Sequence, residues 1–255
     1  YDSLQTKIER RFGNLQFMGS YVWSKSLSMM TYRQIFSQGS QVQAQDAMNL
    51  KDSKGIMYFD IPHFVNLMTS YRLPIGKGQK YFTNVNRFVN LAIGGWTVAG
   101  VQQYRSGTLL QIQSTGNPLG TGVLFAPVTK ANYTGAPIKT GIATGDLDPN
   151  NPNTRWFNYG TNSPFANAAA YTYGTTAMYN SAFRNPWFRN ENFSIQKELL
   201  FAERFRLTYR ADAINLFNRT SFGNTNVTIG NANFGRVQSP QNSQRIVSMG
   251  LRLTF

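Results

Sequence analysis

Few residues in this sequence have the chemistry that catalysis requires. His63 is the only histidine, and the chain of 255 residues contains no cysteine. The carboxylate nearest to His63 in sequence is Asp60. The common nucleophilic mechanisms need a histidine or a thiol held against partner groups. We therefore expect His63 to be a structural residue at the start of a strand and the protein not to be an enzyme, although paired carboxylates stay open.

One acidic motif imitates a metal site without completing it. Asp146, Asp148 and Asn150 have the spacing with which a calcium-binding loop begins. The position that such a loop gives to glycine holds Asn151, and the twelfth position holds Phe157 instead of glutamate. This stretch is therefore expected to be a turn, and we predict neither a metal nor a cofactor.

The formal net charge of +14 raises the question of nucleic-acid binding. The basic residues are dispersed singly along the chain, and the densest points are Arg10-Arg11 and the pair Lys77 and Lys80. A nucleic-acid partner is not expected from such scattered bases. A positively lined channel, or contact with phosphorylated lipid headgroups, accounts for them better.

The chemistry-bearing residues lie within a chain of alternating pattern. The last stretch, residues 244–255, places five apolar side chains at period two: Val247, Met249, Leu251, Leu253 and Phe255. Such a strand has one apolar and one more polar face. About 10 residues also suffice to cross a bilayer at the tilt of a barrel strand.

The same alternation predicts about seven strands, separated by links of alternating length. The predicted strands are 1–12, 14–25, 63–73, 90–113, 190–199, 205–217 and 244–255. Long loops are expected at 26–58, 114–187 and 218–243, and shorter links at Gly13-Asn14, at 74–88 and near Ala202-Glu203. This rhythm predicts an all-β, antiparallel up-and-down transmembrane β-barrel with extracellular long loops and a periplasmic C-terminus.

About seven strands do not complete such a barrel. An ordinary single-chain bacterial barrel has an even number of strands, and an open sheet leaves unpaired edges in lipid. Residues 1–255 are therefore expected to form the C-terminal part of a larger barrel, without a plug. The alternative is a soluble β-sandwich, perhaps carbohydrate-binding, in which the apolar faces of two sheets meet.

Several segments together carry a family resemblance. They are Tyr1-Asp2-Ser3-Leu4-Gln5 with Arg10-Arg11-Phe12, Tyr21-Val22-Trp23-Ser24-Lys25-Ser26, Phe59-Asp60-Ile61-Pro62-His63, Leu73-Pro74-Ile75-Gly76-Lys77-Gly78, Gly94-Gly95-Trp96, Tyr104-Arg105-Ser106-Gly107-Thr108, Asn215-Leu216-Phe217-Asn218 and the terminal Phe255. In this order they resemble the C-terminal barrel of TonB-dependent outer-membrane receptors, especially the Oar-like type with a carboxypeptidase-regulatory-like domain. One departure is Phe64, where the family usually has arginine after the histidine.

The resemblance implies energy-coupled uptake of a glycan, a peptide or a siderophore across the outer membrane. It implies as partners the outer-membrane lipid, further barrel strands, a plug domain and TonB. The barrel-assembly machinery is expected to recognise the last strand through Met249, Leu251, Leu253 and Phe255. A passive porin or an adhesin-like barrel stays open as an alternative function.

Two groups of residues are candidates for contact with substrate. Arg206, Arg210, Asp212 and Arg252 are expected to face the channel, where they guide an anionic substrate or pair with the plug. Five loop aromatics suit stacking on a sugar or peptide: Trp156, Tyr159, Tyr171, Tyr173 and Trp187. Packing of the loops onto one another is the alternative role for these rings.

Overall fold

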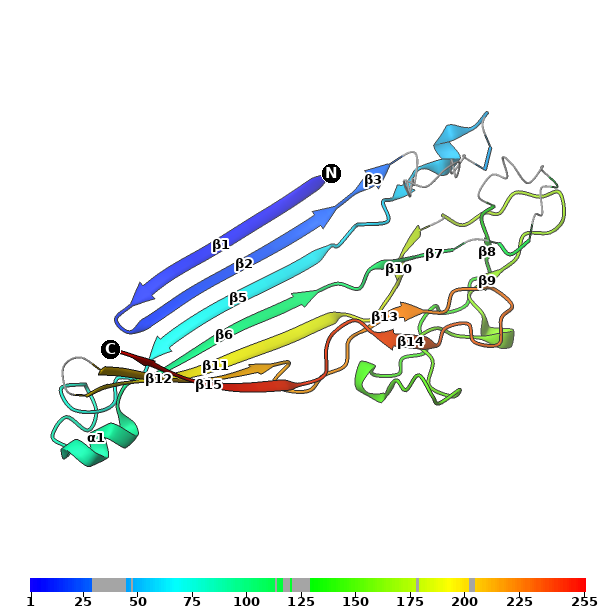
Figure 1. Cartoon of the computed structure of the whole chain (residues 1–255). Coiled ribbons are helices and arrows are strands. Elements are labelled where there is room, and N and C mark those ends of the chain that lie inside the picture. The colour runs from blue at the N-terminus through cyan, green and yellow to red at the C-terminus, as the bar shows by residue number, and fades with distance from the viewer. Residues whose placement is uncertain are drawn as a thin grey trace.

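The computed structural model describes residues 1–28, 45–46, 48–112, 114–116, 120, 129–177, 179–201 and 205–255. One antiparallel sheet of seven strands dominates it, and the strands pair in chain order (Figure 1). They are β1 (Asp2–Phe12), β2 (Leu15–Lys25), β5 (His63–Arg72), β6 (Trp96–Arg105), β11 (Phe188–Phe201), β12 (Phe205–Ile214) and β15 (Ile246–Thr254). Within the described residues β1 and β15 do not pair with each other, so this sheet is open. The predicted number and antiparallel order of the strands are confirmed.

The pairing register divides the side chains of the sheet into two sets, because directly opposed residues share a face. Leu207 opposes Leu253, and Tyr209 opposes Leu251. We call this side the apolar face; it includes Phe17, Tyr21, Val65, Leu67, Trp96, Val98, Phe193, Ile195, Leu207, Tyr209, Met249, Leu251 and Leu253. The opposite polar face includes Lys7, Glu9, Arg11, Asn66, Arg72, Gln103, Asn192, Arg206, Arg210, Asp212 and Arg252.

The apolar face is not covered by a second layer. Met249 and Leu251 are each 72% exposed, and Phe255 is 92% exposed. In the described part of the chain no other sheet packs against these side chains. A β-sandwich requires interlocked apolar faces, so that alternative does not fit this structure.

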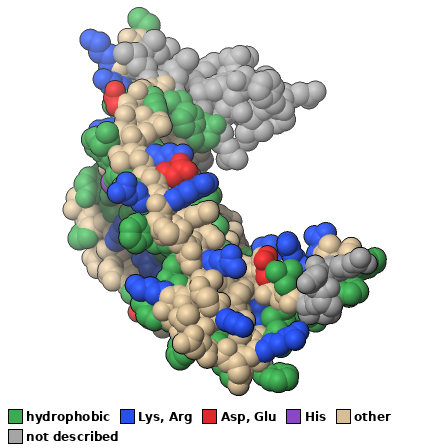
Figure 2. Space-filling view, turned by 90° about the vertical axis from the view of Figure 1, so that its left-hand side faces the viewer, with side chains coloured by type: hydrophobic (Ala, Val, Ile, Leu, Met, Phe, Trp, Pro, Cys, Tyr) green, Lys and Arg blue, Asp and Glu red, His purple; other side chains and the backbone are tan. Residues whose placement is uncertain are grey.

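The sheet curves towards its polar face. One hollow on it is lined by Asn192, Ser194, Arg210, Asp212 and Ser248 among others. A second is lined mainly by residues of β1, β2 and β5, including Glu9, Arg11, Gln16, Met18 and Ser70. Figure 2 shows the molecule bent into an open crescent. The charged and amide side chains of the polar face therefore lie on the concave side.

The predicted strand at 90–113 is wrong at its beginning. Residues Arg87–Ile93 form helix α1, and the Asn86 side chain caps it by accepting a hydrogen bond of 2.8 Å from Val89 N. Gly95 follows with φ of +76°, and a Cβ there would lie 2.5 Å from the carbonyl oxygen of Glu198. The strand β6 begins only after this glycine because the backbone must pass so close to β11.

Two other strand boundaries differ from the prediction. β6 stops at Arg105, and a separate short strand β7 (Leu109–Gln111) follows it. β12 ends at Ile214 instead of residue 217, because Asn215 and Asn218 turn the chain with φ of 50° and 51°.

The tight turn predicted near Ala202-Glu203 lies outside the described residues. None of the described helices has the length and apolar character needed to span a membrane.

The three predicted long loops contain short elements of their own. They hold β3 (Leu27–Ser28), η1 (Leu50–Ser53), β4 (Gly55–Ile56), β8 (Asn132–Tyr133), η3 (Thr144–Asp146), η4 (Gly160–Asn162), β9 (Phe165–Ala166), β10 (Tyr179–Arg184), β13 (Phe222–Thr225) and β14 (Val237–Pro240). Of these, β3, β8, β9, β10, β13 and β14 are labelled in Figure 1, at the end of the sheet opposite α1 and the C-terminus. The described part of the loop predicted at 114–187 is mostly irregular, as expected, and β8, η3, η4, β9 and β10 are its short regular elements.

Candidate functional site: the polar face and the loop unit

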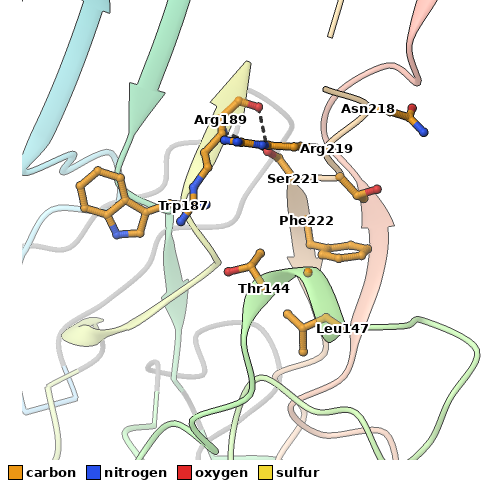
Figure 3. A pocket seen from close by; sticks show the side chains of 10 residues that line it. Thr144, Leu147, Trp187, Arg189, Asn218, Arg219, Ser221 and Phe222 are labelled. Carbon is orange, nitrogen blue, oxygen red and sulfur yellow. Dashed lines mark hydrogen bonds between the residues drawn. The ribbon is translucent and has the colours of Figure 1, made fainter. Parts of the chain in front are cut away.

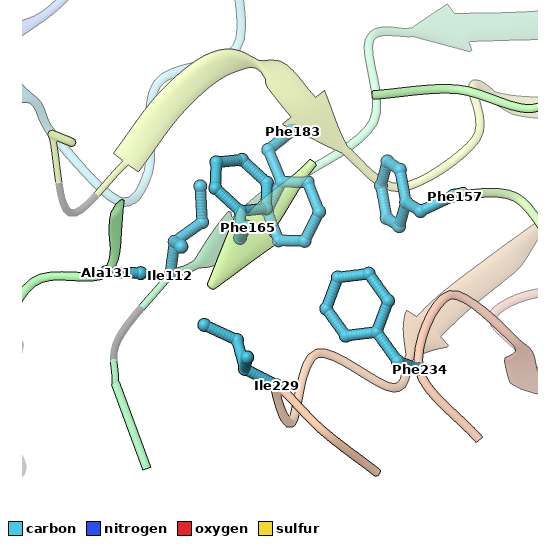
Figure 4. Packing of buried hydrophobic residues seen from close by; sticks show 7 residues of the cluster. All are labelled: Ile112, Ala131, Phe157, Phe165, Phe183, Ile229 and Phe234. Carbon is cyan, nitrogen blue, oxygen red and sulfur yellow. The ribbon is translucent and has the colours of Figure 1, made fainter. Parts of the chain in front are cut away.

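The loops above the sheet pack around a hydrophobic core of their own. Its buried members are Ile112, Ala131, Phe157, Phe165, Phe183, Ile229 and Phe234 (Figure 4). The Phe183 ring lies at the centre, with centroids 4.2 Å from Phe157 and 5.0 Å from Phe165. We call this assembly of β7–β10, β13, β14 and their connecting segments the loop unit. Its core joins three stretches of chain and gives the loops a defined shape.

A buried ion pair ties the loop unit to the beginning of β5. Arg184 Nη2 lies 2.5 Å from Asp60 Oδ2, and these side chains are only 10% and 3% exposed. The Asp60 carboxylate also accepts a hydrogen bond of 2.6 Å from Ser26 N. Asp60 thus connects the end of β2, its own loop and β10. A buried carboxylate and a buried guanidinium are stable only when they are paired and hydrogen-bonded in this way.

Burial also affects the cations beside this ion pair. The pKa of Arg184 is lowered by burial, and the hydrogen bond and charge of Asp60 oppose that shift. The pKa of Lys139 is lowered by burial and, less strongly, by the positive charge of Arg184. Lys139 Nζ lies 4.9 Å from the centroid of the Trp156 ring. The charged form of Lys139 is therefore disfavoured in the folded loop unit.

The structure does not bring the five candidate aromatics together. Trp156 packs against the loop core, and its Nε1 donates to the carbonyl oxygen of Arg184 at 2.7 Å. The Arg155 guanidinium lies 4.4 Å from the centroid of the Tyr159 ring. Tyr171 and Tyr173 are 84% and 53% exposed. Among the described residues no two of these five rings stack on each other, and Trp156 is a packing residue.

The fifth aromatic, Trp187, belongs to a different cluster. Its ring stacks on His63 with centroids 5.9 Å apart. His63 in turn stacks on Tyr21, and Tyr21 Oη lies 2.9 Å from His63 Nδ1. His63 is the first residue of β5, as expected from the sequence. Its ring is occupied by aromatic neighbours at the loop end of the apolar face.

The four candidate channel residues share the polar face of β12 and β15. Arg252 opposes Thr208, and Arg206, Arg210 and Asp212 alternate along the same side of β12. Arg210 Nε lies 2.9 Å from Asp212 Oδ2. Arg206 and Arg252 have no ion pair within the described residues, and three arginines against one aspartate leave this patch positive.

The described residues contain no cluster of three histidine or carboxylate side chains suited to a metal ion. The sequence did not reveal the Asp60–Arg184 pair or the loop core. The only indication in the sequence that Asp60 matters is its place in Phe59-Asp60-Ile61-Pro62-His63, one of the segments that carry the family resemblance.

Comparison with known proteins agrees with this geometry. The sequence profile of a family described as an outer membrane beta barrel domain matches residues 1–248. No curated protein and no solved structure gives a significant match. The match covers nearly the whole chain, and it places the protein in the cell outer membrane. The chain belongs to the outer membrane beta barrel domain family.

Proposed function

We propose that this chain is the C-terminal part of the barrel of a TonB-dependent outer-membrane receptor, of the Oar-like type. Such a receptor imports a substrate, here a glycan, a peptide or a siderophore, with energy from the inner membrane. The observation that carries the proposal is the open sheet with a concave, charged face. Unpaired strand edges are unfavourable in lipid, so further strands complete the wall of a wide channel.

The partners of this proposal follow from the three surfaces of the sheet. The apolar face contacts outer-membrane lipid, and the edges of β1 and β15 pair with further barrel strands. The polar face receives a plug domain, and TonB acts through a segment joined to that plug. Met249, Leu251, Leu253 and Phe255 are the signal that the barrel-assembly machinery reads on β15. Neither a nucleic-acid partner nor an enzymatic activity is part of the proposal.

Orientation in the membrane also follows from this proposal. The C-terminus and the α1 link lie at one end of the sheet, and the loop unit lies at the other (Figure 1). Barrels of this kind have short turns on the periplasmic side. The loop unit is therefore extracellular, where exposed Tyr171 and Tyr173 contact substrate, and Arg206, Arg210, Asp212 and Arg252 line the route below.

Planar-bilayer conductance of the full-length protein, together with its binding to the isolated periplasmic domain of TonB, tests this proposal. A plugged receptor gives little conductance and binds the TonB domain. A passive porin gives steady open-channel conductance and no TonB binding. That second result would reject energy coupling and leave the outer-membrane location unaffected.

A further inference from the structure

A cavity lies where the loop unit meets the upper end of the apolar face. It encloses about 460 Å³ between the η3 segment, the beginning of β11 and residues 218–222. Figure 3 shows Arg189 beside Arg219 and Ser221 in the upper part of the view, Trp187 to their left, and Thr144 below them. We call it the rim pocket. Its volume lies within the range of about 300–1,000 Å³ that is usual for small-ligand sites.

The strand register puts the rim pocket on the lipid side of the wall. Arg189 opposes Tyr104, and along β11 it shares its face with Glu191, Phe193 and Ile195. Phe193 and Ile195 belong to the apolar face, so Arg189 stands above the point where that face ends. The concave polar face lies on the opposite side of the sheet. A solute in the channel therefore does not reach this pocket through the wall.

Two guanidinium groups give the rim pocket its charge. Arg219 Nη1 lies 2.9 Å from Glu191 Oε1, and the Glu191 side chain is only 2% exposed. The Arg219 side chain is 47% exposed, and no other described residue accepts a hydrogen bond from its guanidinium. Arg189 is exposed and makes no ion pair with any described residue. None of the described residues that line the pocket is acidic.

The backbone of the pocket holds Arg189 in place. Arg189 N donates to Ser221 Oγ at 3.0 Å, and Ser221 Oγ donates back to the carbonyl oxygen of Arg189 at 3.1 Å. Ser221 is buried and joins β11 to the segment that bears Arg219. The backbone of Arg189 and the guanidinium of Arg219, which pairs with Glu191, are thus positioned before any ligand arrives. Such positioning lowers the entropic cost of binding.

We infer that the rim pocket binds the phosphate of an outer-leaflet lipid headgroup, with the acyl chains lying along the apolar face below it. Paired arginines are the preferred protein partners of phosphate oxygens. Trp187, 42% exposed beside them, supplies the amphipathic ring that is favoured at a membrane interface. A phosphate ligand from solution satisfies the same arginines but makes no use of the adjoining apolar face.

Binding of short-chain lipids to the full-length protein in detergent tests this inference. The probes are dihexanoyl phosphatidic acid, dihexanoyl phosphatidylcholine and inorganic phosphate. Phosphatidic acid is expected to bind more tightly than either of the others. The variant Arg189→Gln is expected to weaken that binding about tenfold or more, because a charged hydrogen bond is lost. Arg189 makes no ion pair with a described residue, so this variant is expected to fold.

The matched control is the double variant Arg206→Gln/Arg252→Gln, which removes charge from the opposite face of the same sheet. Its affinity for phosphatidic acid is expected to be unchanged. Heat-modifiable migration on gels verifies that each variant is folded. Equal affinity of the wild type and Arg189→Gln would overturn the site. Inorganic phosphate binding as tightly as phosphatidic acid would overturn the lipid assignment and indicate a soluble phosphate ligand.

Discussion

Asp60 and Arg184 form a buried ion pair although 124 residues separate them in the chain. The arginine completes its shell with the carbonyl oxygens of Asp60, at 2.6 Å, and of Ser181, at 3.0 Å. This pair fastens the loop unit onto the sheet at the beginning of β5. The position of the loop unit therefore depends on a contact between the segment that leads into β5 and strand β10.

Replacement of Asp60 by asparagine is expected to loosen the loop unit. Removing one partner of a buried ion pair leaves the other charge uncompensated, which costs about 3–5 kcal/mol. Limited proteolysis of the folded protein should then cut the loops faster while the barrel strands stay protected. The control Asp146→Asn removes an exposed carboxylate from the same unit. Equal cutting rates in the two variants would contradict the role of the pair.

A double-mutant cycle sharpens this test. In Asp60→Asn/Arg184→Met neither member of the pair is charged. The double variant therefore avoids the cost of Asp60→Asn, which leaves the charge of Arg184 buried without a partner. The protease is therefore expected to cut the loops of the double variant more slowly than the summed free-energy changes of the two single variants predict. Additive effects would mean that Asp60 and Arg184 act independently.

The variant Phe183→Ala is expected to unfold the loop unit without unfolding the barrel. Phe183 is fully buried and contacts three other phenylalanine rings. Truncation of a buried phenylalanine costs about 3–5 kcal/mol, a large share of what a small packed unit has. Hydrogen exchange should accelerate in residues 129–184, with heat-modifiable migration retained. Tyr173→Ala, at an exposed ring, is the control and should leave exchange unchanged.

The seven strands were predictable because alternation at period two is a local signal that the pleat imposes on each strand separately. Strands around Leu207, Leu251 and Tyr21 therefore lie close to their predicted places. Gly95 shows where that signal fails, since a helix precedes it and only the approach to Glu198 defines the start of β6. Local pattern does not contain such contacts between strands.

The loop unit was not predictable for a related reason. Phe157, Phe165, Phe183 and Phe234 come from separate segments of the chain, so no period links them, and they meet only through long-range packing. The same holds for Asp60 and Arg184, whose neighbours in sequence give no sign of their pairing. The rim pocket, with Arg189 and Arg219, likewise appears only when β11 and the segment after β12 are side by side.

The loop unit is expected to gain stability as pH rises through the titration of Lys139. Its pKa is lowered by burial and by Arg184, so the folded unit releases this proton before the unfolded chain does at 10.5. Between those two pKa values the unfolded chain holds more protons, and stability therefore rises with pH. Below the lowered pKa of Lys139 the ammonium is charged in the folded unit, and the loop unit bears the full free-energy cost of burying that charge. The effect is modest because Lys139 stays exposed to solvent.

Protease resistance of the loops at about pH 8 and about pH 10.5 measures this dependence. Lys139→Met is expected to be the more resistant protein at the lower pH and to lose the pH-dependent difference due to Lys139. The control Lys51→Met removes an exposed lysine and should keep that difference. Identical pH profiles in the wild type and Lys139→Met would show that Lys139 does not contribute.

Adjacent residues of β15 test which side of the wall contacts lipid. Leu251→Arg places a charge on the apolar face, where an arginine costs about 2–4 kcal/mol at the bilayer midplane. Gly250→Arg places the same side chain on the polar face, and a Cβ at Gly250 has no other atom within 4 Å. The first variant is expected to assemble poorly in the outer membrane, and the second to assemble like the wild type. Quantification of heat-modifiable protein in outer-membrane fractions separates them, and the reverse order would mean that the concave face contacts lipid.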